Sequence, residues 1–400
     1  MPVSCILRGL VLCGLLGLAA PAARADQICR PAALPPLNPC LDDDRISLVA
    51  VGDVLLHRAL QRRAAAQGYL SLWQAAAPWF LGADIAIANL ETPTAPCFVR
   101  GGRQVGDPGL VFDDRVYQGY PLFNAHPAAI DALRAAGVSV VTTANNHALD
   151  RGPAGLDATL EELARRGMHQ TGTIRRGAPR DFVLRIRSRM GVLSLIGCSY
   201  STNGIPDPQR QVLMCHEDRD ELLGLVGHEA SRPRSAGVIV LPHWGIEYSH
   251  SPARRDRDLA RDLVAAGAIA VIGTHPHVVQ PWEVIPGAAG DALVAYSTGN
   301  FVSAQRSLPR ATGQMVVAEL CRGPAGVVLA GAGWVPVLMV ADRHGLTLML
   351  PEPGARGVPG QARALVERLV PGRDVSLAAA CQPFDPAAAG GQRASHRADP

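Results

Sequence analysis

The sequence has no lysine, so all 38 of the basic residues among its 400 are arginine. This bias is typical of a G+C-rich genome and indicates no particular binding surface. The 35 acidic residues nearly balance the arginines, and the formal net charge is +3. A charge this small gives no sign of a surface for nucleic acid or another polyanion. With 48% hydrophobic and 18% charged residues, the chain can bury the core of one large α/β domain or two modest ones.

Long apolar runs are also lacking. The first run, residues 9–20, is short for a membrane span; it follows Arg8 and precedes a small-x-small triplet at 23–25. This pattern predicts a signal peptide over residues 1–25, with an uncleaved anchor as the alternative. We therefore expect an exported protein, periplasmic or extracellular, with membrane association as a further alternative. A second uncharged run, residues 326–341, is interrupted by glycine and proline and favours two antiparallel strands at a sheet edge.

The cysteine spacings contain no zinc-ribbon pattern. Two of the nine cysteines lie within residues 1–25, which leaves seven in the exported protein. In an oxidising compartment, structural disulfides are their expected use. We predict the pairs Cys29–Cys40 and Cys198–Cys215, although sequence alone does not fix disulfide connectivity.

Short apolar runs rich in valine and isoleucine alternate with helical patterns in residues 46–305, which predicts an α/β domain with a largely parallel sheet. Residues 26–45 are rich in proline and aspartate and predict a tether without regular structure. Residues 306–350 predict strands that complete the domain, and residues 351–400 a partly disordered tail with one helix. Residues 98–127 have no clear period and predict a long loop near the site. The expected strands are 46–51, 84–92, 138–147, 191–199, 236–245, 268–278 and 293–301.

Polar residues gather at the ends of these expected strands. The carboxyl ends of parallel strands share one edge of a sheet, where such folds carry their chemistry. Divalent metals bind carboxylate, imidazole and amide oxygen donors, and a pair of metals needs a bridging group. His275 and His277, two apart in an expected extended segment, should face the same way. The sequence therefore predicts a metal site from Asp53, Glu91 or alternatively Asn89, Asn146, His243, His275 and His277.

His147 follows the predicted ligand Asn146 and is a candidate proton donor to a leaving oxygen. Asp150 has two alternative roles, either orienting His147 or capping the helix that follows. We expect His57 to line the pocket rather than to bind metal.

Six motifs occur in a fixed order: VGDVLLHR, IANLETP, TTANNHALDRG, LPHWGIEY, GTHPHVVQPWE and YSTGNF. Together they resemble the capsule-biosynthesis CapA family, also called poly-gamma-glutamate synthesis proteins, which is related to calcineurin-like metallophosphoesterases. The resemblance spans residues 46–305 and implies a four-layer α/β/β/α sandwich. It also implies that Glu91 is the bridging carboxylate and that the remaining ligands are those above. The first motif departs from the wider superfamily, because Leu55 stands where a histidine is usual, which leaves one ion or an altered pair as alternatives.

Two functions follow from the resemblance. The first is an exported, metal-dependent phosphoesterase-like hydrolase with one or two Mn, Fe or Zn ions and His147 as general acid, acting on a capsule polymer such as poly-gamma-glutamate or on a phosphoester. The second is a non-catalytic polymer-handling or assembly factor that keeps the fold and works with membrane-bound capsule synthesis or export proteins. Neither reading involves nucleic acid. Replacing His147 by alanine should leave metal content unchanged under both, and should abolish an activity only under the first.

Overall fold

The computed structural model describes residues 27–383. The predicted signal peptide and the last part of the predicted tail lie outside these residues. Among the described residues, no helix has the length and apolar character that crossing a membrane requires.

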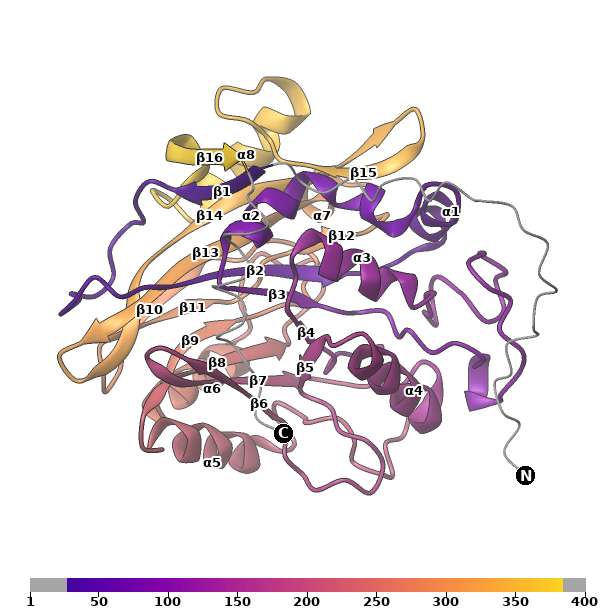
Figure 1. Cartoon of the computed structure of the whole chain (residues 1–400), viewed down its shortest axis with the longest axis horizontal. Helices are drawn as coiled ribbons and strands as arrows, with labels where there is room; N and C mark the ends of the chain where they lie inside the picture. Colours follow the sequence, from indigo (N-terminus) through magenta and orange to yellow (C-terminus); the bar gives the residue numbers. More distant parts are fainter. Residues whose placement is uncertain (1–26, 384–400) are drawn as a thin grey trace.

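Two mixed β-sheets form the centre of the described chain (Figure 1). One is eight-stranded, in the order β15-β14-β13-β2-β3-β4-β5 with β12 paired to β2, and β2 to β5 run parallel. Its strands are β2 (Ile46–Val54), β3 (Ile85–Asn89), β4 (Val140–Thr142), β5 (His169–Thr171), β12 (Asn300–Val302), β13 (Thr312–Gly323), β14 (Gly326–Asp342) and β15 (Gly345–Met349). The other is six-stranded, in the order β10-β11-β9-β8-β7-β6, and β7, β8, β9 and β11 run parallel. Its strands are β6 (Val183–Ser188), β7 (Gly191–Ser199), β8 (Ser235–His243), β9 (Ala268–Ile272), β10 (Trp282–Pro286) and β11 (Asp291–Ala295).

Helices cover the outer face of each sheet. Figure 1 shows α2 and α3 on one side of the strands and α5 on the other. Those against the eight-stranded sheet are α1 (Arg58–Gln67), α2 (Ala77–Gly82), α3 (Ala128–Ala136) and α4 (Gly152–Arg165). Those against the six-stranded sheet are α5 (Arg219–Ala230) and α6 (Arg254–Ala265). The elements α7 (Leu308–Ala311) and α8 (Gly357–Leu369) follow later in the chain. The predicted four-layer α/β/β/α sandwich is confirmed.

Alternation of side chains along the strands explains the layers. In β2, Leu48 and Ala50 pack between the two sheets, whereas Val49 and Val51 pack against the helices. Successive side chains of a strand point to opposite faces, so a strand covered on both sides must be apolar at every position. The continuous apolar runs of the sequence therefore indicate strands buried on both faces. They do not indicate how many sheets the strands form.

The amino-terminal segment corrects one prediction. Residues 26–45 are not a structureless tether, because β1 (Gln27–Pro31) pairs antiparallel with β16 (Ala379–Pro383). The amide of Asn38 also donates hydrogen bonds to the carbonyls of Asp291 and Leu329, at 2.9 Å each. The segment is thus anchored to the six-stranded and eight-stranded sheets by contacts distant in sequence, which its composition cannot reveal.

The disulfides are partly as predicted. Cys198–Cys215 is confirmed. Cys29–Cys40 is wrong, since Cys29 pairs with Cys381 and Cys40 with Cys321. The register of β1 and β16 places Cys29 directly opposite Cys381, and only the folded chain brings these positions together.

The carboxyl-terminal part contains one long strand where two were expected. Residues 326–341 lie within β14, a single strand of 17 residues paired with β13 on one side and β15 on the other. β13 pairs with β14 across its glycines and its proline, whereas β15 pairs only with the last five residues, so pairing with β13 outweighs the breaks that the glycines and proline suggest. Helix α8 confirms the helix expected in the tail.

Candidate metal centre

The predicted ligands converge where the carboxyl ends of the parallel strands of both sheets meet. Asp53 lies within β2 rather than after it, and the other ligands lie at or beyond the ends of β3, β4, β8 and β9. All are buried: Asp53, Glu91, Asn146, His243, His275 and His277. Contacts cross from one sheet to the other here, since the amide nitrogen of Asn89 lies 3.1 Å from Nδ1 of His243. The predicted edge is therefore a seam between two sheets.

Glu91 lies at the base of this seam and is fully buried. Neither of its carboxylate oxygens has a hydrogen-bond partner among the described residues. Oε1 lies 3.5 Å from Nε2 of His243 and 3.9 Å from Nε2 of His277. Burial, followed by the negative charge of Asp53 and then that of Glu247, raises the pKa of Glu91 well above its ordinary value. A buried carboxylate without donors is strongly unfavourable unless a cation compensates it.

Two sets of donors share Glu91. One contains Glu91, His243 and His275, and the other contains Asp53, Glu91 and His277; within each set the donor atoms lie within 4.8 Å of one another. A carboxylate common to two sets is the arrangement that a pair of divalent ions requires. The donors present therefore fit a divalent metal ion, and Glu91 belongs to both sets.

His243 and His275 have lowered pKa values. Burial, followed by the charge of neighbouring histidines, lowers the pKa of His243 and of His275 well below the ordinary value. Both rings are consequently neutral at neutral pH, which is the form that binds a metal. Nε2 of His243 lies 2.9 Å from Oδ1 of Asn146, so the two predicted donors lie side by side.

The backbone of the His-Pro-His segment is not extended. The prediction that His275 and His277 face the same way because they lie two apart in an extended segment is therefore wrong in its geometry. His275 has φ of 99° and His277 has φ of 57°, both in the left-handed region. Non-glycine residues held there cost free energy and concentrate at functional sites. His277 Nδ1 lies 3.0 Å from Asp53 Oδ2 and 3.0 Å from Oδ1 of Asn300, whereas Nδ1 of His275 has no partner among the described residues.

His147 forms a pair with Asp150 beside the centre. Its Nδ1 lies 2.8 Å from Oδ2 of Asp150, which also accepts the backbone N–H of Phe123 at 2.6 Å. Asp150 does not cap α4, whose N-cap position is Arg151 and has no side-chain cap hydrogen bond. Of its two predicted roles, the orientation of His147 is the one observed. Burial raises the pKa of Asp150.

The long loop over residues 98–127 contributes to this pair. The ring of Phe123 meets the ring of His147 edge-on, with 4.7 Å between centroids, and meets His57 at 5.2 Å. His57 lies beside the centre but belongs to none of the donor sets found in residues 27–383. Burial lowers the pKa of His57 to about 4, despite the hydrogen bond between its ring and the carbonyl of Leu55.

Three residues near the predicted ligands have contacts that the sequence did not predict. Asn89 holds Asp53 in place rather than acting as the bridging ligand: its amide donates to Oδ1 of Asp53 at 2.8 Å, and its own Oδ1 accepts from Thr142 at 2.8 Å. The ring of Tyr200 packs against that of His275, with centroids 4.2 Å apart and the ring planes tilted by 36°. Glu247 is exposed and forms a third donor set with His275 and His277. Glu247 follows His243 by four residues in the motif LPHWGIEY, which was the only signal for it.

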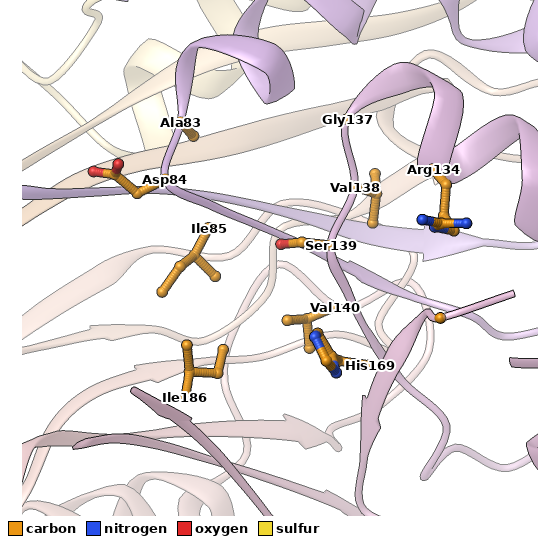
Figure 2. Close-up of a pocket in the computed structure, with 11 residues that line it drawn as sticks. Ala83, Asp84, Ile85, Arg134, Gly137, Val138, Ser139, Val140, His169 and Ile186 are labelled. Carbon is orange, nitrogen blue, oxygen red and sulfur yellow. The ribbon is translucent and has the colours of Figure 1, made fainter. Parts of the chain in front are cut away.

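Figure 2 shows a separate cavity. It has a volume of ≈ 190 Å³ and is lined by the first residues of β3, β4 and β5, together with Asp84 and Arg134. It therefore opens at the amino ends of the parallel strands, whereas the donors gather at their carboxyl ends. Its lining contains none of the predicted ligands.

Comparison with known proteins identifies the family. The profile of the family described as "Bacterial capsule synthesis protein PGA_cap" matches residues 47–305, which is more than half of the chain. The chain belongs to this CapA-type capsule synthesis family. Within the family, it is 26% identical over 267 residues to "PGA biosynthesis protein CapA" of Bacillus subtilis (strain 168), covering 65% of this chain and 64% of that protein. It is 25% identical over 269 residues to "Capsule biosynthesis protein CapA" of Bacillus anthracis, covering 65% and 60%. The match thus spans less than two thirds of the length of either relative.

Solved structures give weaker likenesses. The calcineurin-like phosphoesterase YfkN from Bacillus subtilis is 14% identical with a TM-score of 0.42, and the alignment covers 81% of this chain and 96% of that one. A hypothetical protein from Thermus thermophilus is 16% identical with a TM-score of 0.41, over 72% and 98%. These TM-scores are low, and the two-sheet arrangement described above rests on the strand pairings of this chain.

Proposed function

We propose that this CapA-type protein is an exported, metal-dependent hydrolase of the phosphoesterase kind that acts in capsule or poly-gamma-glutamate biosynthesis. The observation that carries the proposal is Glu91, a fully buried carboxylate without a hydrogen-bond partner among the described residues that two donor sets share. A purely structural core would bury a neutral side chain at this position. The family membership and the names of the relatives support the biological setting.

The residues divide the work between binding and proton transfer. Asp53, Glu91, Asn146, His243, His275 and His277 would hold one or two divalent ions, and their nitrogen and oxygen donors suit Mn, Fe or Zn. An ion bound there would polarise a phosphoryl or acyl oxygen and activate a water molecule. Asp150 holds Nδ1 of His147, which leaves the Nε2 atom to give a proton to the leaving oxygen. The ring of Phe123 restricts the orientation of His147.

A substrate has space beside the centre. A cavity of ≈ 360 Å³ is lined by Tyr200 and by residues of the segment 201–218. The ring of Tyr200 lies 4.2 Å from that of His275 between centroids, so one lining residue of this cavity contacts a predicted ligand. Its size suits one or two repeating units of a capsule polymer or a small phosphoester, with the remainder of a polymer lying outside.

Export is supported by the cysteines. Residues 27–383 contain three described disulfides, and such bonds persist in oxidising compartments and are rare in the cytosol. The proposed partners are the polymer or phosphoester substrate and membrane-bound capsule synthesis or export proteins.

The test is metal analysis of the purified protein beside a His275→Ala, His277→Ala double variant, with His228→Ala as the matched control. His228 is exposed on α5, outside the donor sets of the described residues. The wild type and the control should retain metal that the double variant loses. All three are then assayed against phosphomonoesters, phosphodiesters and poly-gamma-glutamate, and turnover should follow metal content.

The outcomes separate the two functions. Turnover of one substrate class by the metal-loaded wild type supports the hydrolase and fixes the bond type. Metal without turnover of any class favours the non-catalytic polymer-handling factor. A wild type that holds no metal under any loading condition contradicts the proposed centre itself.

A further inference from the structure

Each of the two donor sets that share Glu91 has a side-chain amide oxygen beside it. Oδ1 of Asn146 lies 2.9 Å from Nε2 of His243, and Oδ1 of Asn300 lies 3.0 Å from Nδ1 of His277. All of these residues are buried. Catalytic sites hold a transition metal through three or more protein ligands and keep one position open. The third donor set, Glu247 with His275 and His277, is the one that has an exposed member.

Glu247 lies next to the donors on the solvent side. It belongs to the turn between β8 and α6, and its carboxylate comes within 4.8 Å of ring nitrogens of both His275 and His277. Nδ1 of His275, in a ring that is 1% exposed, has no partner among the described residues, and Nδ1 of His277 is already engaged with Asp53. His275 thus keeps one ring nitrogen without a partner among the described residues, and one ring nitrogen of each histidine lies near the carboxylate.

The turn that carries Glu247 is fixed to the His-Pro-His segment by its backbone. The N–H of Trp244 donates to the carbonyl of Thr274 at 3.1 Å, and the N–H of Tyr248 donates to the carbonyl of Pro276 at 2.7 Å. Gly245, between them, has φ of 108°, and a Cβ there would lie 2.9 Å from Cγ of Pro276. Only glycine allows this approach without strain. The backbone therefore holds residue 247 beside the histidines, whatever its side chain.

We propose that Glu247 is a ligand of the metal centre, closing it from the solvent side together with His275 and His277. The inference rests on the proposed function, since it assumes that the buried donors hold metal. A third carboxylate beside Asp53 and Glu91 brings the negative charge of the centre to three, which suits two divalent ions better than two carboxylates do. The Glu247 carboxylate forms a donor set with both His275 and His277.

The test compares metal binding by the full-length wild type, Glu247→Gln and Glu352→Gln. Glu352 is also exposed and lies outside the three donor sets of the described residues and outside the cavity beside Tyr200, so it controls for loss of one surface charge. Each protein is stripped of metal and titrated with Mn²⁺ and with Zn²⁺ in a calorimeter, and bound metal is counted after dialysis. Because residue 247 is exposed, the glutamine variant should fold as the wild type does, which circular dichroism checks.

We expect Glu247→Gln to bind at least about tenfold more weakly, or to lose one equivalent of metal, because even residues behind the ligands cost that much when removed. Glu352→Gln should match the wild type. If Glu247→Gln binds the same amount with the same affinity, the inference is wrong while the proposed centre stands. Loss of turnover with unchanged metal binding also contradicts it, since the carboxylate would then act on the substrate. If the wild type binds neither metal, the proposed function fails as well.

Discussion

Replacing Glu91 by glutamine should stabilise the metal-free protein. The carboxyl group is fully buried, and burial together with the charge of Asp53 raises its pKa in the folded state. An acid whose pKa is raised on folding costs no stability below its unfolded pKa of 4.5. Above that pH the cost grows by about 1.4 kcal/mol per pH unit until the folded pKa is reached.

The size of the effect follows from this linkage. At about pH 7.5, some three pH units above the unfolded pKa, the cost to the wild type has a ceiling of about 4 kcal/mol. The amide of the glutamine would itself lack hydrogen-bond partners, which lowers the stability of the variant by about 1–2 kcal/mol. We therefore expect Glu91→Gln to raise the free energy of unfolding by about 2 kcal/mol at about pH 7.5 without metal, and to lower it by about 1–2 kcal/mol at about pH 4, where only the amide penalty remains.

The assay is urea unfolding in the presence of a chelator at both pH values, with Glu229→Gln as the matched control. Glu229 is also buried, but it accepts hydrogen bonds from Arg185 and Ser194 at 2.8 Å each. Although burial raises the pKa of Glu229, these bonds outweigh it and the pKa is lowered. Glu229→Gln should therefore destabilise, by about 1–3 kcal/mol, where Glu91→Gln stabilises. A metal-free Glu91→Gln protein less stable than the wild type at about pH 7.5 would refute the reasoning, because the carboxylate would already be compensated.

Three further outcomes are expected. His147→Ala should lower kcat by about 10²-fold or more with bound metal unchanged, and Asp150→Asn should lower it less, because the ring loses only its orientation; equal loss of metal and turnover would contradict this. Metal affinity should fall as pH drops through the raised pKa of Glu91, with protons released on binding, and calorimetry in two buffers of different ionisation enthalpy measures that release. Removing the Cys40–Cys321 disulfide by a double serine substitution should cost roughly 2–5 kcal/mol of unfolding free energy, because it closes a loop with a sequence separation of 281; an unchanged urea midpoint would count against it.

The candidate site was largely predictable because it depends on one local rule. Polar residues that end apolar strands in an α/β fold lie at a common edge, so Glu91, His243 and His275 could be named before their neighbours were known. The rule failed for Glu247, which lies in a turn and reaches the histidines only because its backbone is tied to Pro276. It also gave the wrong reason for the His-Pro-His segment, whose left-handed backbone no spacing rule predicts.

The individual roles of residues within the site could be assigned only from the structure. Asp150 was equally acceptable as a helix cap or as the partner of His147, and only the position of α4 relative to Phe123 separates these roles. Asn89 was considered as a bridge, yet its amide nitrogen contacts Asp53 and His243 at once. Side-chain amides can serve either as ligands or as supports, and the choice depends on atoms contributed by other strands.

The sequence by itself determined the buried parallel strands β2, β3, β4, β7, β8 and β9 and the side chains that follow them, because both depend on the polarity of neighbouring residues along the chain. It did not predict β5, β6 or β10, and it joined β11 and β12 into one strand. The tertiary structure decided how those strands divide into two sheets and how the chain ends are fastened, as in the pairing of β1 with β16 and Cys29 with Cys381. These outcomes depend on contacts between residues hundreds of positions apart. The candidate metal centre depends on both. Its donor residues can be found from local sequence patterns, but the seam where they meet forms only when the two sheets pack face to face.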